Sequence, residues 1–255
     1  MPALIQDIAH AKNAVGRAIA ELELHDGLLN NPSFFIPRPC SRLFVSHEFD
    51  LRGARPDVCV ADVDDEIFEA RRSGGFLPCF SAGASAIVTA LRIRRGPAAM
   101  NDLLDEAAMY VGLPAARRGL QQLRREDVVA VGHGVALASA MTRCAVHQVV
   151  AVEAKIGRWR AAAQQAHRWR LAVDEAWLAL PASYVGNLSL DLPGLKTFGI
   201  VGIDAEGRLG RALSPPSRRA DRLNKVLTEQ YVFSRWLDEL DLLDTGLVGL
   251  RTMRA

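Results

Sequence analysis

Cysteine pairs, regularly spaced histidines and long apolar runs are missing from this 255-residue sequence, and each absence excludes a class of protein. The four cysteines form no C-x-x-C pair, so we expect neither a zinc site nor a disulfide framework, and they are interpreted as small core residues. The six histidines show no H-x-H or H-x-x-x-H spacing, so no histidine-based metal site is indicated. No apolar run approaches the roughly 20 residues that span a bilayer. The opening residues, MPALIQDIAH, lack the pattern of a signal peptide, so we expect a cytoplasmic protein without membrane contact.

The positions of the charged residues say more about this chain than its net charge does. A net charge of +2 is only mildly basic and does not by itself demand nucleic acid as a partner. Arginines gather in four stretches, residues 92–95, 117–125, 158–170 and 218–222. A planar guanidinium suits phosphate contacts, but a GC-rich genome also favours arginine codons, and the two explanations carry equal weight. With 49% hydrophobic residues, the chain can build one large or two small domains with real cores.

One short stretch, VVAVEAKIG at Val149–Gly157, predicts a buried strand that carries two opposite charges. Side chains alternate along a strand, so Glu153 and Lys155 point to one side. Burying either charge unpaired would cost several kcal/mol, on the order given for isolated ions in an apolar interior. An isolated E-x-K is most often an ion pair at a strand end, so its neighbours in the sequence decide whether it does more.

Those neighbours form a recognisable order of elements. Upstream lies RPDVCVAD, a short apolar strand in which Asp57 follows a proline. Downstream, a helix from Trp159 to about Val173 carries QAHRW. Proline-aspartate, then E-x-K, then a helix with Q-A-x-x-aromatic resembles the PD-(D/E)XK nuclease superfamily. The resemblance covers residues 42–62 and 143–211, and it implies an α/β protein with a restriction-endonuclease-like mixed-sheet core.

The resemblance also implies a catalytic site. Asp57, Glu153 and the carbonyl of Ala154 would hold Mg²⁺ or Mn²⁺, for which hard oxygen ligands are suited. Lys155 would orient the attacking water and stabilise the developing negative charge. Gln165 matches the glutamine of the superfamily's Q-x-x-x-Y motif, although tryptophan stands where tyrosine is usual and removes its hydroxyl. We expect the superfamily's reaction, hydrolysis of a phosphodiester bond that leaves a 5′ phosphate.

Two further acids and two arginines are candidates around this site. Apolar spacing predicts a helix over residues 3–24 that ends at the sequence HDG, and Glu21 on it is either an acid near the metal or part of a solvated face. Glu48 lies on an expected hairpin with the aspartate strand and is either a ligand or an exposed strand residue. Arg158 and Arg168, on the helix after the E-x-K strand, would hold a phosphate backbone.

A segment of roughly 80 residues separates the two motif strands, which is longer than an ordinary loop and indicates an inserted domain. Helices are predicted over 84–94, 101–111 and from Pro114 onward, followed by a hairpin around a Gly-His-Gly turn. Three helices and a hairpin resemble a winged helix-turn-helix, whose second paired helix enters the DNA major groove. The matching donors on that helix are Arg117, Arg118, Gln121, Gln122, Arg124 and Arg125.

These observations predict a core formed by residues 1–65 and 141–255, with a winged-helix-like insertion at 66–140. The expected function is a divalent-metal-dependent DNA endonuclease, a hydrolase that the winged helix positions on DNA. The alternative is a catalytically silent DNA-binding protein or regulator built on a nuclease-like core, and docking of a partner protein by the winged helix stays open as well. Nucleases with one site per chain that cut both strands are often homodimers, so a homodimer is compatible with this interpretation.

Overall fold

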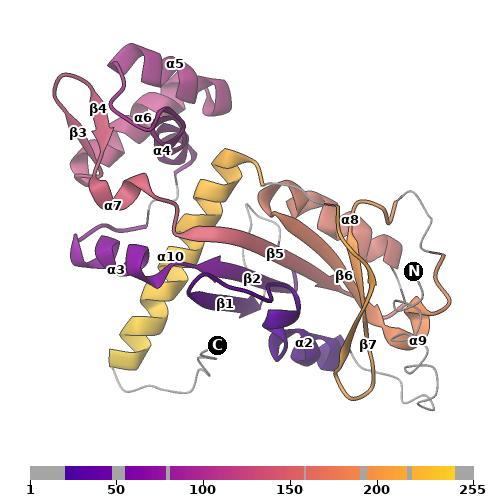
Figure 1. The fold of residues 1–255 in the computed structure, drawn as a ribbon. Helices are drawn as coiled ribbons and strands as arrows, with labels where there is room; N and C mark the ends of the chain where they lie inside the picture. Colours follow the sequence, from indigo (N-terminus) through magenta and orange to yellow (C-terminus); the bar gives the residue numbers. More distant parts are fainter. Residues whose placement is uncertain are drawn as a thin grey trace. The chain divides into compact units, whose positions relative to one another are not determined.

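The computed structural model describes residues 21–47, 55–78, 81–157, 159–189, 194–216 and 220–244. It confirms the α/β class, with a mixed six-stranded sheet and helices (Figure 1). The chain divides into two compact units. The sheet unit comprises Met1–Pro39, Leu43–Asp62 and Gln148–Ala220, and the helical unit comprises Cys40–Arg42, Val63–His147 and Asp221–Ala255. No helix in the described part of the chain is long and apolar enough to cross a membrane.

The six-stranded sheet has the order β1-β2-β5-β6-β7-β8. Its strands are β1 (Arg42–His47), β2 (Val58–Val63), β5 (Val146–Ala154), β6 (Glu175–Pro181), β7 (Gly199–Ile203) and β8 (Leu209–Leu213). Strands β5, β6 and β7 run parallel to one another, and β8 returns antiparallel to β7. The remaining elements of this unit are α2 (Glu21–Leu29), a 3₁₀ turn (Pro32–Phe34), α8 (Trp159–Trp169), a second 3₁₀ turn (Arg170–Ala172) and α9 (Ala182–Val185).

The register of β5 follows from the alternation of its side chains. Val150, Val152 and Ala154 belong to one hydrophobic cluster with Leu24 and Leu28 of α2. Residues between them must therefore face the other side of the sheet. Glu153 is one of these residues. The structure therefore confirms both the predicted strand and the face of the sheet on which Glu153 lies.

Helix α2 differs from its prediction at the C-terminal end. The helix continues through His25 and Gly27 and ends at Leu29, rather than breaking at the sequence HDG. A Cβ on Gly27 would lie 3.2 Å from a methyl group of Ile203 and 3.3 Å from the carbonyl oxygen of Gly207. The glycine therefore permits a close approach to the β7–β8 turn and does not end the helix. The earlier part of the predicted helix lies outside the described residues.

The helical unit contains a three-helix group followed by a two-stranded hairpin. Its elements are α3 (Asp65–Ser73), α4 (Ala82–Arg94), α5 (Met100–Val111), α6 (Leu113–Arg125), β3 (Val129–Val131), β4 (Val135–Leu137), α7 (Ser139–Thr142) and α10 (Arg222–Asp244). Ala98, between α4 and α5, forms an antiparallel bridge with Val135 of the hairpin. Helices α4 and α6 cross with their backbones in contact, because a Cβ on Gly119 would lie 2.1 Å from the carbonyl carbon of Gly83. Only glycine fits this crossing.

Helix α10 belongs to the helical unit, whereas the expected division grouped residues 141–255 with the core. Its aromatic side chains pack in the helical unit, where Phe233 lies 4.9 Å and Trp236 lies 5.6 Å from Phe68 of α3, measured between ring centroids. The indole of Trp236 also donates a hydrogen bond to Asp65, at 2.9 Å. These contacts join segments about 170 residues apart in the sequence, and such pairing leaves no local pattern from which it could be predicted.

The cysteines also differ in part from their expected core positions. Cys59 is buried and Cys144 is half-buried, but Cys40 is exposed, and Cys79 lies outside the described residues. All three described thiols are free, in agreement with the absence of a disulfide pattern in the sequence.

Candidate active site

Asp57, Glu153 and Lys155 lie together at the ends of two neighbouring strands of the sheet. Asp57 immediately precedes β2, Glu153 is the second-last residue of β5, and Lys155 follows β5. The carboxylate of Asp57 accepts a hydrogen bond from the backbone N–H of Ala154, at 2.7 Å. The N–H of Lys155 donates to the carbonyl of Ala179 in β6, at 3.0 Å, which extends the ladder by one residue. Backbone pairing therefore fixes the positions of all three side chains.

The ammonium group of Lys155 lies between the two carboxylates. Its Nζ is 3.6 Å from Oδ2 of Asp57 and 3.5 Å from Oε1 of Glu153. The Glu153 side chain is almost fully buried, with 2% of its surface exposed, whereas those of Lys155 and Asp57 have 22% and 17% exposed. The site therefore has one buried wall and one side open to solvent.

The environment of Glu153 makes its ionised form unfavourable. Burial, followed by the neighbouring charge of Asp57, raises the pKa of Glu153 from 4.5 to about 7, and Lys155 only partly opposes this. The indole of Trp169 on α8 also lowers this pKa, although neither its nitrogen nor Oε2 of Glu153 completes a hydrogen bond of normal geometry with a described residue. A buried carboxylate oxygen without a partner can accept a proton or bind a cation.

Two histidines at this site were missed from the sequence. Nε2 of His25, on α2, is buried without a hydrogen-bond partner in the described chain and lies 3.7 Å from Oδ1 of Asp57. Its other ring nitrogen is 3.2 Å from Nε2 of His47, at the end of β1. The two histidines are 22 residues apart, so a search for short histidine spacings cannot find them. No local pattern in the sequence brings them together, because His25 lies within α2 and His47 ends β1.

Several predicted site residues are not brought into this cluster. Gln165 is exposed on α8, and no hydrogen bond joins it to Lys155 among the residues that the structure describes. Arg168, on the same helix, is exposed as well. Glu21 begins α2, but its side chain is not among those described, and Glu48 and Arg158 lie outside the described residues altogether.

The donors at the strand ends fit a hard divalent cation. No group of three or more His, Cys, Asp and Glu side chains within the described ranges could hold a metal by itself. Mg²⁺ needs no such cage, because it is usually bound through one or two carboxylates and keeps several waters. Asp57 and the unpartnered oxygen of Glu153 are hard oxygen donors of the kind that Mg²⁺ or Mn²⁺ prefers.

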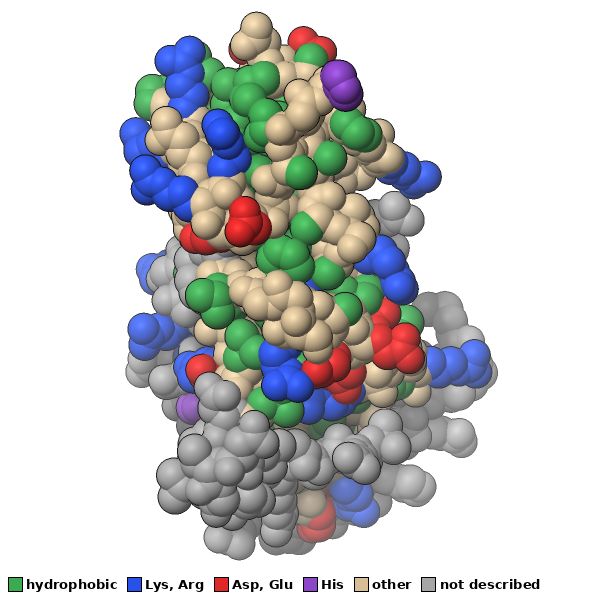
Figure 2. Space-filling model, turned by 90° about the vertical axis from the view of Figure 1, so that its left-hand side faces the viewer, with side chains coloured by type: hydrophobic (Ala, Val, Ile, Leu, Met, Phe, Trp, Pro, Cys, Tyr) green, Lys and Arg blue, Asp and Glu red, His purple; other side chains and the backbone are tan. Residues whose placement is uncertain are grey.

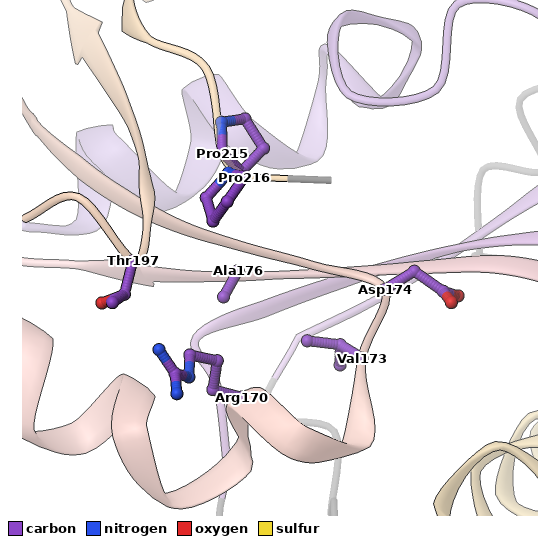
Figure 3. Close-up of a pocket in the computed structure, with 7 residues that line it drawn as sticks. All are labelled: Arg170, Val173, Asp174, Ala176, Thr197, Pro215 and Pro216. Atoms are coloured by element: carbon purple, nitrogen blue, oxygen red, sulfur yellow. The ribbon is translucent and has the colours of Figure 1, made fainter. Parts of the chain in front are cut away.

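A separate pocket of about 170 Å³ in the sheet unit does not share these residues (Figure 3). Prolines 215 and 216, Thr197 and the guanidinium of Arg170 border it. The carboxylate of Asp174 points away from it and instead accepts hydrogen bonds from the N–H groups of Val149, at 2.9 Å, and Ala220, at 3.0 Å. Asp174 thus ties the beginning of β6 to the strand that carries Glu153.

A second group of predicted residues lies on α6 of the helical unit. Arg117, Arg118, Gln121, Arg124 and Arg125 are all exposed. The amide of the sixth, at position 122, donates to the carboxylate of residue 126, at 3.0 Å, so it is already engaged. In Figure 2, lysine and arginine side chains gather along one side of this unit. The leucines at 120 and 123 are buried as the helical spacing predicts.

Comparisons with known proteins do not place the chain in a family. No family model matches it, and no curated protein matches it. Among solved structures, the SPO1766 protein of unknown function from Silicibacter pomeroyi aligns over 93% of this chain and 100% of that chain, with 12% sequence identity and a TM-score of 0.41. A likeness of this size carries no argument about function, so the site must be interpreted from its own geometry.

The raised pKa of Glu153 predicts how stability depends on pH. A carboxyl whose pKa is about 7 when folded and 4.5 when unfolded binds its proton more tightly in the folded state. Its stabilising effect is therefore complete below pH 4.5 and is lost as the pH rises through 7. Between these limits, without divalent metal, the wild type should lose roughly 3 kcal/mol of unfolding free energy relative to Glu153→Gln.

Urea denaturation in EDTA at several pH values measures this difference. A Trp236→Phe background restricts the fluorescence signal to the three tryptophans of the sheet unit. Glu206→Gln, which changes an exposed glutamate of the same unit, serves as the control and should follow the wild type at every pH. A difference between wild type and Glu153→Gln that stays constant from pH 4.5 to 8 would contradict the assigned environment.

Proposed function

We propose that this protein is a divalent-metal-dependent DNA endonuclease of the PD-(D/E)XK type. The observation that carries the proposal is the convergence of Asp57, Glu153 and Lys155 at the ends of β2 and β5. The ammonium nitrogen of Lys155 lies within 3.6 Å of both carboxylates. The order of elements around them supports it, because the acid-bearing strands are neighbours and the crossover through α8 leads to a parallel strand. Two carboxylates can hold the metal ion of a phosphodiesterase, and a lysine beside them can stabilise the charge that develops on the phosphate.

Each residue has a defined task in this proposal. Asp57, Glu153 and the carbonyl of Ala154 would hold Mg²⁺ or Mn²⁺, which when bound makes a water more acidic and offsets negative charge on the phosphate. Lys155 orients the attacking water and stabilises the charge that develops on the phosphate oxygens. The water oxygen bonds to phosphorus as the bond to the 3′ oxygen breaks, leaving a 5′ phosphate and a 3′ hydroxyl. Burial of Glu153 keeps bulk water away from one side of the site.

We further propose that the three-helix group and hairpin of the helical unit form a winged helix that positions the enzyme on DNA. The antiparallel bridge between Ala98 and Val135 supports this, because it ties the segment between α4 and α5 to the hairpin. Helix α6 would then lie in the major groove, with its exposed arginines and Gln121 directed to bases and phosphates. Docking of a partner protein by this unit would leave those arginines without effect on DNA affinity.

Metal-dependent cleavage of DNA tests the catalytic proposal. Supercoiled plasmid and single-stranded DNA are each incubated with protein in Mg²⁺, Mn²⁺ or EDTA, and nicking is followed by gel electrophoresis. We expect cleavage only with metal, and a loss of rate of about 100-fold or more in Lys155→Met, since it removes a charge that stabilises the transition state. Asp57→Asn should show a similar loss because it weakens the metal site.

Lys196→Met, at an exposed lysine of the same unit, is the matched control and should cleave at the wild-type rate. Cleavage that persists in Lys155→Met and Asp57→Asn would show that the site is wrongly assigned. Absence of cleavage in every metal, with DNA still bound in EDTA, would favour the alternative of a silent DNA-binding protein.

Salt-dependent DNA binding tests the role of α6. In EDTA, Arg117→Gln and Arg118→Gln should each weaken binding to duplex DNA, and removal of one arginine–phosphate ion pair should reduce the slope of log affinity against log salt by about 0.9. Fluorescence anisotropy at several salt concentrations gives both quantities. Arg235→Gln, at an exposed arginine of α10 in the same unit, is the control. Equal affinities for all of these variants would show that α6 does not bind DNA.

A further inference from the structure

The helical unit contains a pocket of about 280 Å³ where the end of α4 meets the beginning of α10. Its lining is strongly basic, with Thr89, Arg92, Ile93, Arg95, Cys144, Arg222, Lys225 and Val226. Four of these eight side chains are cationic, and no carboxylate belongs to the lining among the residues that the structure describes. A concave surface lined by charges of one sign concentrates the potential and attracts ions of the opposite sign.

The charge behind the pocket wall does not cancel this potential. Glu229 is fully buried on α10 and forms ion pairs with both Arg71 and Arg92, the latter at 2.7 Å. Burial by itself would raise the pKa of Glu229, but Arg92 and Arg71 outweigh it and lower that pKa to about 2. This carboxylate is therefore ionised and shared by two guanidinium groups, so the cluster keeps a net positive charge. A buried excess charge is costly unless an opposite charge lies close to it.

The backbone holds one of the other cations of the pocket in place. Lys225 donates a hydrogen bond to the carbonyl of His147, at 2.6 Å. Arg222 begins α10, and the nearby carboxylate of Asp221 is used to cap that helix, accepting from the N–H groups of residues 223, at 3.1 Å, and 224, at 3.2 Å. In the described chain, no carboxylate forms an ion pair with Arg95 or Arg222.

The backbone at Arg95 is unusual for a residue with a side chain. This residue caps α4 in the left-handed conformation, with φ of 57°, where glycine is strongly preferred. A glycine at position 95 would adopt this conformation without strain, but the glycine of the sequence is the next residue, Gly96. Strained residues that persist in a fold often serve function. Here the strain places a guanidinium at the mouth of a basic pocket.

We propose that this pocket binds a phosphate group through Arg95, Arg222 and Lys225. Guanidinium forks pair with two phosphate oxygens at once, and a lysine ammonium adds a point charge. Ile93 and Val226 add an apolar wall against which the sugar of a phosphate ester can pack. The phosphate belongs either to a nucleic-acid strand or to a free nucleotide. The proposal does not depend on the nuclease activity, because all of its residues lie in the helical unit.

Isothermal titration with inorganic phosphate, deoxyadenosine monophosphate and a DNA 12-mer, at constant ionic strength set with sodium chloride, tests the site. The informative variants are Arg95→Gly and Arg95→Gly with Arg222→Gln. Arg95→Gly removes a cation and relieves the strained backbone, so thermal stability should stay the same or rise while phosphate affinity falls. We expect the double variant to bind inorganic phosphate at least tenfold more weakly than the wild type.

Arg235→Gln, at an exposed arginine of α10 in the same unit, is the control and should bind inorganic phosphate as the wild type does. Weaker binding of both the 12-mer and inorganic phosphate by the double variant supports a nucleic-acid phosphate. Weaker binding of phosphate and the mononucleotide alone supports a free phosphate ester. Unchanged phosphate affinity in the double variant, or no binding of any of the three ligands by the wild type, overturns the proposal.

Discussion

The sheet unit places two carboxylates at one point, with the ammonium group of Lys155 between them. Glu153 is buried by the alternation of β5, and Asp57 is held beside it by the N–H of Ala154. Burial and then the charge of Asp57 oppose ionisation of Glu153, and Lys155 compensates this only in part, since the pKa of Glu153 still rises to about 7. A folded protein rarely keeps such an arrangement for stability alone, because a neutral or apolar residue would cost less. The site is therefore poised to gain from a further cation.

The helical unit shows the opposite imbalance. Arg71 and Arg92 share the single buried carboxylate of Glu229, and further cations surround the adjacent pocket. The sheet unit thus has an excess of negative charge at its site, which a divalent cation would offset. The helical unit has an excess of positive charge, which an anion would offset. Phosphate-containing substrates and their metal ions carry these two charges. The cation site and the phosphate site that we propose would therefore suit the same class of ligand.

The sequence predicted what depends on local patterns. Strand β5 and the facing of Glu153 and Lys155 follow from period-two alternation, and the helices and hairpin of the helical unit follow from spacing, glycine and proline. The features that the sequence did not predict depend on contacts between residues that are far apart in the chain. Helix α10 joins the helical unit through long-range contacts, and His25 lies beside Asp57 although the two are far apart in the sequence. Exposure of Gln165 likewise reflects the orientation of α8, which a motif match does not specify.

Direct binding of Mn²⁺, followed by electron paramagnetic resonance of the free ion at pH 6 and pH 8, tests the central claim without relying on activity. The claim is that the buried carboxyl of Glu153 and Asp57 form a cation site that a proton occupies at low pH. Wild-type protein should bind Mn²⁺ more tightly at pH 8 than at pH 6, since Glu153 must release its proton first. Glu153→Gln should lose most of the affinity and the pH dependence. Equal binding by wild type and Glu153→Gln at both pH values would contradict the claim.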